Sequence, residues 1–113
     1  MIEVTIYKKK NKISSFKLSG HAESGPYGYD LVCAAVSAVS FGAVNAVIEL
    51  CEINLNIKQG CEGGFLFVEI PHTTDVQLWE KASLLFDAMV ISLQTIELEY
   101  SQFIKISEKK EGL

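Results

Sequence analysis

An α+β domain is predicted by three features of this 113-residue sequence. Short stretches in which apolar and polar residues alternate come in two pairs, near residues 2–18 and 53–70. A long uncharged segment follows the first pair, and a long amphipathic segment follows the second. The resulting order ββαββα predicts an antiparallel sheet of two hairpins packed against two helices.

Each predicted hairpin has its own turn. In the first, a polar turn at residues 8–12 separates two alternating stretches. In the second, a glycine-rich turn at residues 60–64 leads into a dense β-forming run that ends before Pro71. The apolar positions that define the alternation are Ile2, Val4, Ile6, Phe16 and Leu18 in the first hairpin, and Ile53, Leu55 and Ile57 in the second.

The two helices are predicted from a cap and from periodicity. Asp30 is a good N-cap residue for the uncharged segment, which runs to about Cys51. From Thr74 to Phe103, apolar residues recur at steps of three or four between charged ones. At 1.5 Å per residue this second helix would extend roughly 40 Å, more than the diameter expected of so small a domain, so we expect part of it to meet another subunit. A frayed polar tail is expected from Ser107.

Composition bounds the domain count and the partners. With 49% apolar residues, the whole chain, 1–113, is expected to fold as one domain around one core. Ten lysines, no arginine and fourteen acidic residues give a formal net charge of −4. The sequence thus lacks the guanidinium groups that bind phosphate in a bidentate way, which predicts no direct nucleic-acid partner. The net negative charge would instead attract a basic polypeptide.

Residues 31–48 carry no charge over eighteen positions, which meets the minimum length for crossing a bilayer. The run contains Ser37, Ser40 and Asn45 and lacks an aromatic belt and basic flanks. These features favour a buried helix covered on both sides, and no membrane association. The chain also opens without a basic segment leading into an apolar run, which predicts a cytoplasmic protein.

The three cysteines show no disulfide framework and no zinc spacing. Cys51 and Cys61 flank the second hairpin without a Cys-x-x-Cys pair, and His72 follows Pro71 alone. We therefore expect reduced thiols, no metal and no cofactor.

His21 and Cys33 carry the strongest chemical signal. His21 ends the first hairpin, and Cys33 lies three residues beyond the Asp30 cap, so both face the same loop. Free backbone N–H groups and the helix dipole favour a thiolate at Cys33, and a neighbouring imidazole could take the thiol proton. The alternative is that Cys33 is a small apolar residue that packs the helix.

Four further residues are candidates for supporting or substrate-binding roles. Ser37 lies one helical turn after Cys33, where its hydroxyl could orient a substrate or bond back to its own helix. Asp30 could orient His21, but we favour a role as helix cap, which explains an Asp at that position without catalysis. Gly20 and Gly25 could act as hinges of the loop at 22–29, or could permit tight turns.

Two stretches carry a resemblance to a known family: Gly20-His21-Ala22-Glu23-Ser24-Gly25 and Asp30-Leu31-Val32-Cys33-Ala34-Ala35-Val36-Ser37. They closely resemble the ribosomal-processing cysteine proteases, the Prp or YsxB-like family, and the resemblance covers nearly the whole chain. It implies a catalytic dyad of His21 and Cys33 and a homodimeric α+β fold. It also implies a substrate, the short N-terminal extension of a large-subunit ribosomal protein, removed after a Phe-Phe-Ala-like segment in support of ribosome assembly.

Three alternatives stay open at the level of sequence. A non-catalytic module could bind ribosomal protein through the same groove, with Cys33 as packing. A metal-binding or redox-sensing domain could use Cys33, His21 and Cys61. A small thioesterase or amidase could use the same dyad, because these enzymes share the parts needed for acyl transfer.

Overall fold

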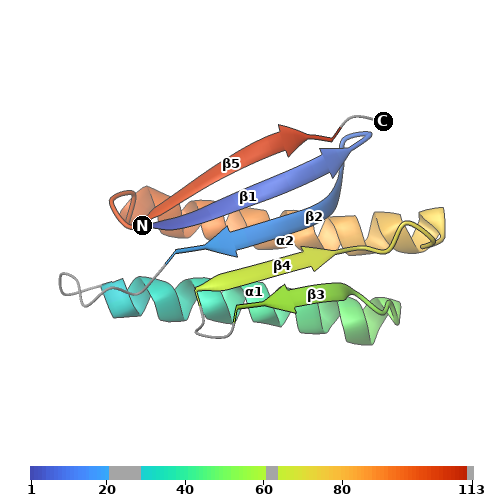
Figure 1. Ribbon diagram of the computed structural model, residues 1–113, viewed down its shortest axis with the longest axis horizontal. Helices are drawn as coiled ribbons and strands as arrows, with labels where there is room; N and C mark the ends of the chain where they lie inside the picture. The colour runs from blue at the N-terminus through green and yellow to red at the C-terminus, as the bar shows by residue number, and fades with distance from the viewer. Residues whose placement is uncertain (21–28, 61–63, 112–113) are drawn as a thin grey trace.

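The computed structural model describes residues 1–20, 29–60 and 64–111, and at residues 29 and 30 the backbone alone. Two strands, a helix, two strands, a second helix and a last strand follow one another along the chain (Figure 1). Their bounds are β1 Ile2–Lys9, β2 Lys12–Ser19, α1 Tyr29–Cys51, β3 Asn56–Gln59, β4 Phe65–Glu69, α2 Val76–Glu99 and β5 Ile104–Lys110.

The sheet has five strands in the order β3-β4-β2-β1-β5. Three of its four pairings are antiparallel, and β1 with β5 is parallel. The predicted α+β class, both hairpins and both helices are confirmed. The expected all-antiparallel sheet of two hairpins is wrong, because a fifth strand makes the sheet mixed.

The end of the chain departs most from the prediction. The second helix was expected to reach Phe103 but ends at Glu99, and the expected polar tail is strand β5. Ile104 and Ile106 alternate with polar residues, and Ile104 is buried beside β1. The N–H of Ile2 donates to the Phe103 carbonyl at 2.8 Å, so the edge of β1 supplies hydrogen bonds that a tail in water would lack.

A bulge in the first hairpin connects the sheet to α2. The register of β1 and β2 shifts after Tyr7, which leaves Ser14 without a partner on the opposite strand. Both backbone groups of the neighbouring Ile13 are then satisfied by α2. The Ile13 N–H donates to Ser83 Oγ at 2.9 Å, and its carbonyl accepts from Trp79 Nε1 at 2.9 Å. In the second hairpin, β3 begins only at Asn56, so Ile53 and Leu55 belong to its connection with α1.

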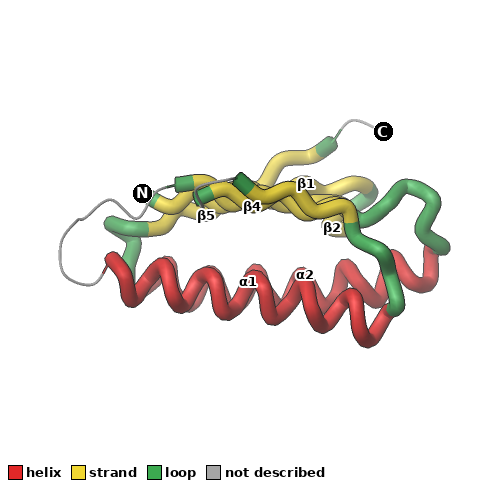
Figure 2. Tube along the Cα trace, turned by 60° about the horizontal axis from the view of Figure 1, so that its bottom comes forward, coloured by secondary structure: helices red, strands yellow, loops and turns green. Residues whose placement is uncertain are grey.

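Both helices cover the same face of the sheet and run antiparallel to each other (Figures 1 and 2). With 24 residues, α2 is about 36 Å long, and it lies along the 44 Å axis of an elongated molecule. One elongated domain therefore accommodates the length of α2, and the expected contact of this helix with another subunit stays a prediction. One end of the helical layer carries the N-terminus of α1, and the other end carries the N-terminus of α2.

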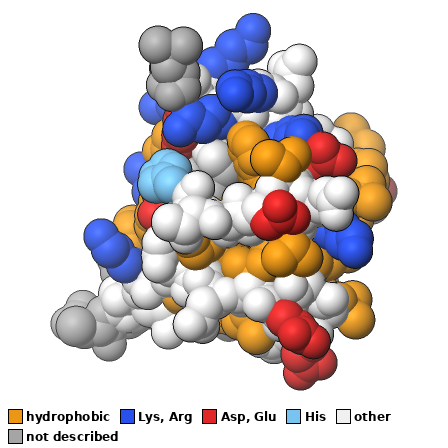
Figure 3. All heavy atoms as spheres, turned by 90° about the vertical axis from the view of Figure 1, so that its right-hand side faces the viewer, with side chains coloured by type: hydrophobic (Ala, Val, Ile, Leu, Met, Phe, Trp, Pro, Cys, Tyr) orange, Lys and Arg blue, Asp and Glu red, His pale blue; other side chains and the backbone are white. Residues whose placement is uncertain are grey.

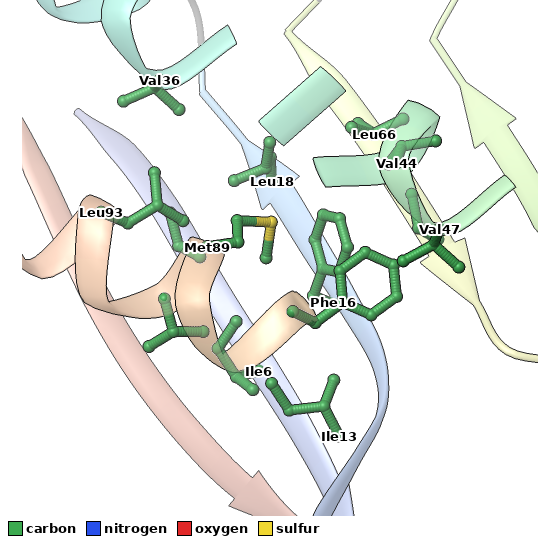
Figure 4. Close-up of a cluster of buried hydrophobic side chains, with 14 of the residues drawn as sticks. Ile6, Ile13, Phe16, Leu18, Val36, Val44, Val47, Leu66, Met89 and Leu93 are labelled. Carbon is green, nitrogen blue, oxygen red and sulfur yellow. The ribbon is translucent and has the colours of Figure 1, made fainter. Parts of the chain in front are cut away.

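The core is one apolar layer between the sheet and the helices (Figure 4). Phe16 of β2 and Phe86 of α2 meet edge to face there, with ring centroids 5.2 Å apart. Both aromatic side chains are almost completely buried. The side chains labelled around them are Ile6, Ile13, Leu18, Val36, Val44, Val47, Leu66, Met89 and Leu93.

Helix α1 is covered on one side only, which corrects the expectation of cover on both sides. Val32, Val36, Val44 and Val47 are buried against the sheet and α2, while the opposite face is exposed. The segment 31–51 is long and apolar enough to cross a membrane by length and composition alone. One such helix is weak evidence for a span, because the core helix of a globular domain has the same length and composition.

Two buried serines are expected to respond oppositely to alanine substitution. Ser83 Oγ accepts the Ile13 N–H, so Ser83→Ala leaves a buried donor unpaired and should lower the free energy of unfolding by about 1–3 kcal/mol. Ser40 Oγ is fully buried without a hydrogen-bond partner among the described residues, so Ser40→Ala should raise that free energy by about 1 kcal/mol. Urea denaturation measures both, and equal losses would contradict the assignment.

Candidate active site

A cavity of about 520 Å³ lies where the N-terminal half of α1 meets the ends of β2, β3 and β4. Its walls are mostly apolar, with a few polar groups and three glycines. That combination is typical of a site for a peptide or a small molecule. The lining residues are Ile2, Leu18, Ser19, Gly20, Cys33, Val36, Ser37, Phe41, Gln59, Gly60, Gly64, Phe65 and Leu66.

Cys33 is the nucleophilic group in this cavity. It is half-buried and not in a disulfide. Because α1 begins at Tyr29, Cys33 is the fifth helical residue rather than a member of the first turn. Side chains on a helix tilt toward its N-terminus, so the thiol still faces the first turn, where unpaired N–H groups and the helix dipole stabilise negative charge.

One wall of the cavity is a single strip of α1. Cys33, Ser37 and Phe41 follow each other at steps of four residues and all line the cavity. The placement of Ser37 beside Cys33 therefore agrees with its helical spacing. Phe41 lies two turns from the thiol, about 12 Å along the helix, and extends the apolar wall.

Gly20 closes the floor of the cavity by a close approach of two backbones. Its φ is +135°, and a Cβ there would lie 2.4 Å from the Met1 carbonyl oxygen and 2.9 Å from Ile2 Cα. Its N–H donates to the Gly64 carbonyl at 2.9 Å, which ties the end of β2 to the start of β4. Of the two sequence interpretations, the structure supports a position that only glycine can occupy.

The structure brings together three of the six predicted site residues: Cys33, Ser37 and Gly20. His21 and Gly25 lie outside the described residues, although Gly20, which precedes His21 in the chain, lines the cavity with Cys33. Asp30 is by its backbone the second residue of α1, whereas the prediction placed it at the cap before the first helical residue.

Sequence reasoning missed the second wall, which includes Gln59, Gly60, Gly64 and Phe65 from the β3–β4 hairpin. Phe65 pairs with Ser19 across β4 and β2, and this pairing carries the hairpin to the cavity. The pairing joins residues far apart in sequence, so no local sequence pattern predicts it. Phe41, in contrast, could have been found from its spacing to Cys33.

Metal ligands do not gather in the described part of the chain. No group of three or more His, Cys, Asp or Glu side chains there could hold a metal ion. Cys51 is buried at the other end of α1, and His72 Nε2 lies 3.8 Å from Glu69 Oε2. Cys61 lies outside the described residues. Among described groups, the chemistry of the cavity therefore centres on the Cys33 thiol.

A thiol facing a helix N-terminus, beside a peptide-sized apolar cavity, defines the class of thiol-dependent hydrolases acting on acyl groups. Comparison with known proteins identifies the family. The model of the family described as cysteine protease Prp matches residues 1–105. The ribosomal processing cysteine protease Prp of Bacillus subtilis is 43% identical over 108 residues, which cover 95% of this chain and 96% of that protein. The Prp of Staphylococcus aureus is 36% identical over 96% of this chain and 97% of its own.

Solved structures agree with the sequence relatives. A crystal structure of the ribosomal processing protease Prp from S. aureus in complex with a substrate peptide matches with a TM-score of 0.85 and 37% identity, over 96% of this chain and 100% of that one. The structure of SMU.848 from Streptococcus mutans matches with a TM-score of 0.87 and 31% identity, over 98% and 96%. The chain belongs to the Prp family, and it is a ribosomal processing cysteine protease.

Gly20→Ala is expected to lower the free energy of unfolding by more than about 2 kcal/mol, because the added Cβ meets backbone atoms at a positive φ. Gly42→Ala is the matched control. A Cβ at Gly42 meets nothing within 4 Å, so the same substitution inside α1 should raise stability by about 0.5–1 kcal/mol. Chemical denaturation of both variants checks the difference, and a Gly20→Ala protein as stable as the wild type would refute it.

Proposed function

We propose that this enzyme removes the short N-terminal extension of a large-subunit ribosomal protein, cutting after a Phe-Phe-Ala-like segment with Cys33 as nucleophile and His21 as general base. The observation that carries the proposal is the Cys33 thiol in a mostly apolar cavity of about 520 Å³. The S. aureus structure with a substrate peptide supports a peptide as the occupant.

The reaction proceeds in two acyl-transfer steps. The thiolate of Cys33 bonds to the scissile carbonyl carbon, and His21 passes the proton it took to the leaving amine as the C–N bond breaks. Water then attacks the thioester, releases the carboxylate product and restores the thiol. Backbone N–H groups of the first turn of α1 stabilise the oxyanion of each tetrahedral intermediate. The chemistry needs no cofactor.

The geometry of the groove supports an aromatic recognition segment. An extended peptide advances about 3.3 Å per residue, so the roughly 12 Å from Cys33 to Phe41 spans three to four substrate residues. Apolar side chains from α1 and from the β3–β4 hairpin line this distance. Aromatic substrate side chains close to the cut bury large apolar areas against such walls.

The charge of the enzyme suits this substrate. A formal net charge of −4 attracts a basic ribosomal protein, and the attraction weakens as salt is added. Reduced thiols and a ribosomal substrate are both consistent with a cytoplasmic enzyme.

Cleavage of a peptide containing Leu-Gln-Phe-Phe-Ala, followed by mass spectrometry, tests the proposal. Cys33→Ala and His21→Ala should each lose turnover by a factor of about 10³ or more, because the nucleophile or the base is gone. Cys51→Ala is the matched control: this buried thiol lies eighteen residues along α1, so cleavage should persist. If the wild type leaves the peptide intact under reducing conditions, a peptide-binding module replaces the protease as the leading function.

We further propose that a second copy of the chain covers the exposed faces of both helices. On α2, Leu84, Ile91 and Leu98 repeat every seven residues and are 64–86% exposed. On α1, Leu31 and Leu50 are also exposed. Exposed apolar side chains along two neighbouring helices suit an interface, and the seven-residue spacing matches helix-on-helix packing. A twofold dimer would bury the same face on both copies.

Light scattering tests the dimer. The wild type should have about twice the chain mass of 12.5 kDa, and Leu84→Glu with Ile91→Glu should return it to the monomer mass, because the interface would bury unpaired charge. Ile57→Glu places the same charge on the edge strand β3, where Ile57 is also exposed, and should leave the mass unchanged. A monomeric wild type at micromolar concentration would refute the dimer.

A further inference from the structure

One part of the end opposite the cavity concentrates positive charge. Six of the ten lysines in the chain lie there, where β5 ends beside the β1–β2 turn. The parallel register places Lys110 beside Lys8 and the antiparallel register places Lys9 beside Lys12. Figure 3 views this end and shows lysine side chains gathered on one part of it. The lysine tip, as we call it, consists of Lys8, Lys9, Lys10, Lys12, Lys109 and Lys110.

Acidic neighbours neutralise only part of this charge. Lys8 Nζ pairs with Glu108 at 3.2 Å, and Lys12 Nζ pairs with Glu80 at 3.0 Å. Glu111 also lies here, with its carboxylate near Ser15 Oγ at 3.4 Å. Within the described part of the chain, no ion pair engages the other four lysines: Lys9, Lys10, Lys109 and Lys110.

A second cavity, of about 280 Å³, adjoins these lysines. It combines an indole ring, from the single tryptophan Trp79, with the hydrogen-bonding side chains of Ser14, His72 and Thr74. Lys9 and Lys10 also line it. Trp79 is held in place, since its Nε1 donates to the Ile13 carbonyl and Lys12 Nζ lies 5.3 Å from its ring centroid.

We propose that the lysine tip binds single-stranded RNA, with phosphates on the four unpaired lysines and a base in the Trp79 cavity. Lysine acts as a point-charge partner for phosphate, and an aromatic surface beside a basic track is the arrangement that binds unpaired bases. An acidic peptide would use the lysines but not the indole. A membrane would require exposed large apolar groups, and the β1–β2 turn and β5 have none.

The proposed RNA site departs from the inference drawn from composition alone. A whole-chain charge of −4 predicted no nucleic-acid partner, but that sum averages over charges that the fold separates. The cavity with Cys33 and the lysine tip lie at opposite ends of a molecule 44 Å long. RNA on the tip therefore leaves the peptide groove open, and this enzyme of ribosomal processing could hold RNA and substrate together.

Fluorescence titration of the wild type with a single-stranded RNA of about 20 nucleotides tests the proposal directly. Trp79 is the only indole, so a base entering its cavity should quench the intrinsic emission. With four phosphate contacts, the logarithm of the binding constant should fall with the logarithm of salt with a slope of about −3. Charge reversal of Lys9, Lys10, Lys109 and Lys110 to Glu should weaken binding at least about tenfold at low salt.

The other four lysines provide a control with the same change in net charge. Reversal of Lys17, Lys58, Lys81 and Lys105 to Glu leaves the lysine tip intact and should keep most of the affinity and the quenching. Circular dichroism confirms that both variants fold. Absence of quenching, equal loss of affinity in both variants, or equally tight binding of polyglutamate or of anionic vesicles would each overturn the proposal. Peptide cleavage by the tip variant is a separate readout, so failure of either proposal is distinguishable.

Discussion

The structure depends on one apolar layer, buried between one face of a five-stranded sheet and two antiparallel helices. Small domains have little interior, and here a single interlayer contains almost all of it. The Phe16–Phe86 contact lies in this layer, and α2 also completes the hydrogen bonding of the bulged first hairpin through Ser83 and Trp79. Sheet and helices are therefore joined by apolar burial and by specific polar contacts.

This layer also positions Cys33, the proposed nucleophile. Because α1 lies along the sheet, its first turns reach the end of β2, and Cys33 comes to lie beside Gly20. The β3–β4 hairpin forms the opposite wall of the cavity, because the pairing of β4 with β2 places this hairpin there. The close backbone approach at Gly20 then sets the floor of the cavity. The cavity of this small protein is thus built from the ends of secondary-structure elements.

The one-sided helical layer and the elongated shape each have a consequence. The outer face of the helical layer exposes leucine and isoleucine side chains to water. Burial of these side chains against a second copy would be favourable, which is the physical basis for the proposed dimer. The elongated shape separates the two ends of the molecule. One end carries the thiol and its groove, and the other carries six lysines beside an indole-lined cavity.

Local chemistry in the sequence determined the α+β class, both hairpins, the bounds of α1 to within two residues, and Cys33 with Ser37 on one strip of a helix. These features follow from periodicity and turn residues, which act over a few positions. Tertiary structure alone decided strand β5. Its apolar residues Ile104 and Ile106 follow directly on the helical periodicity, and only the pairing with the edge of β1 makes the segment a strand. It also decided the Gln59 and Phe65 wall and the segregation of lysines, because each brings together residues whose separation in sequence carries no local signal.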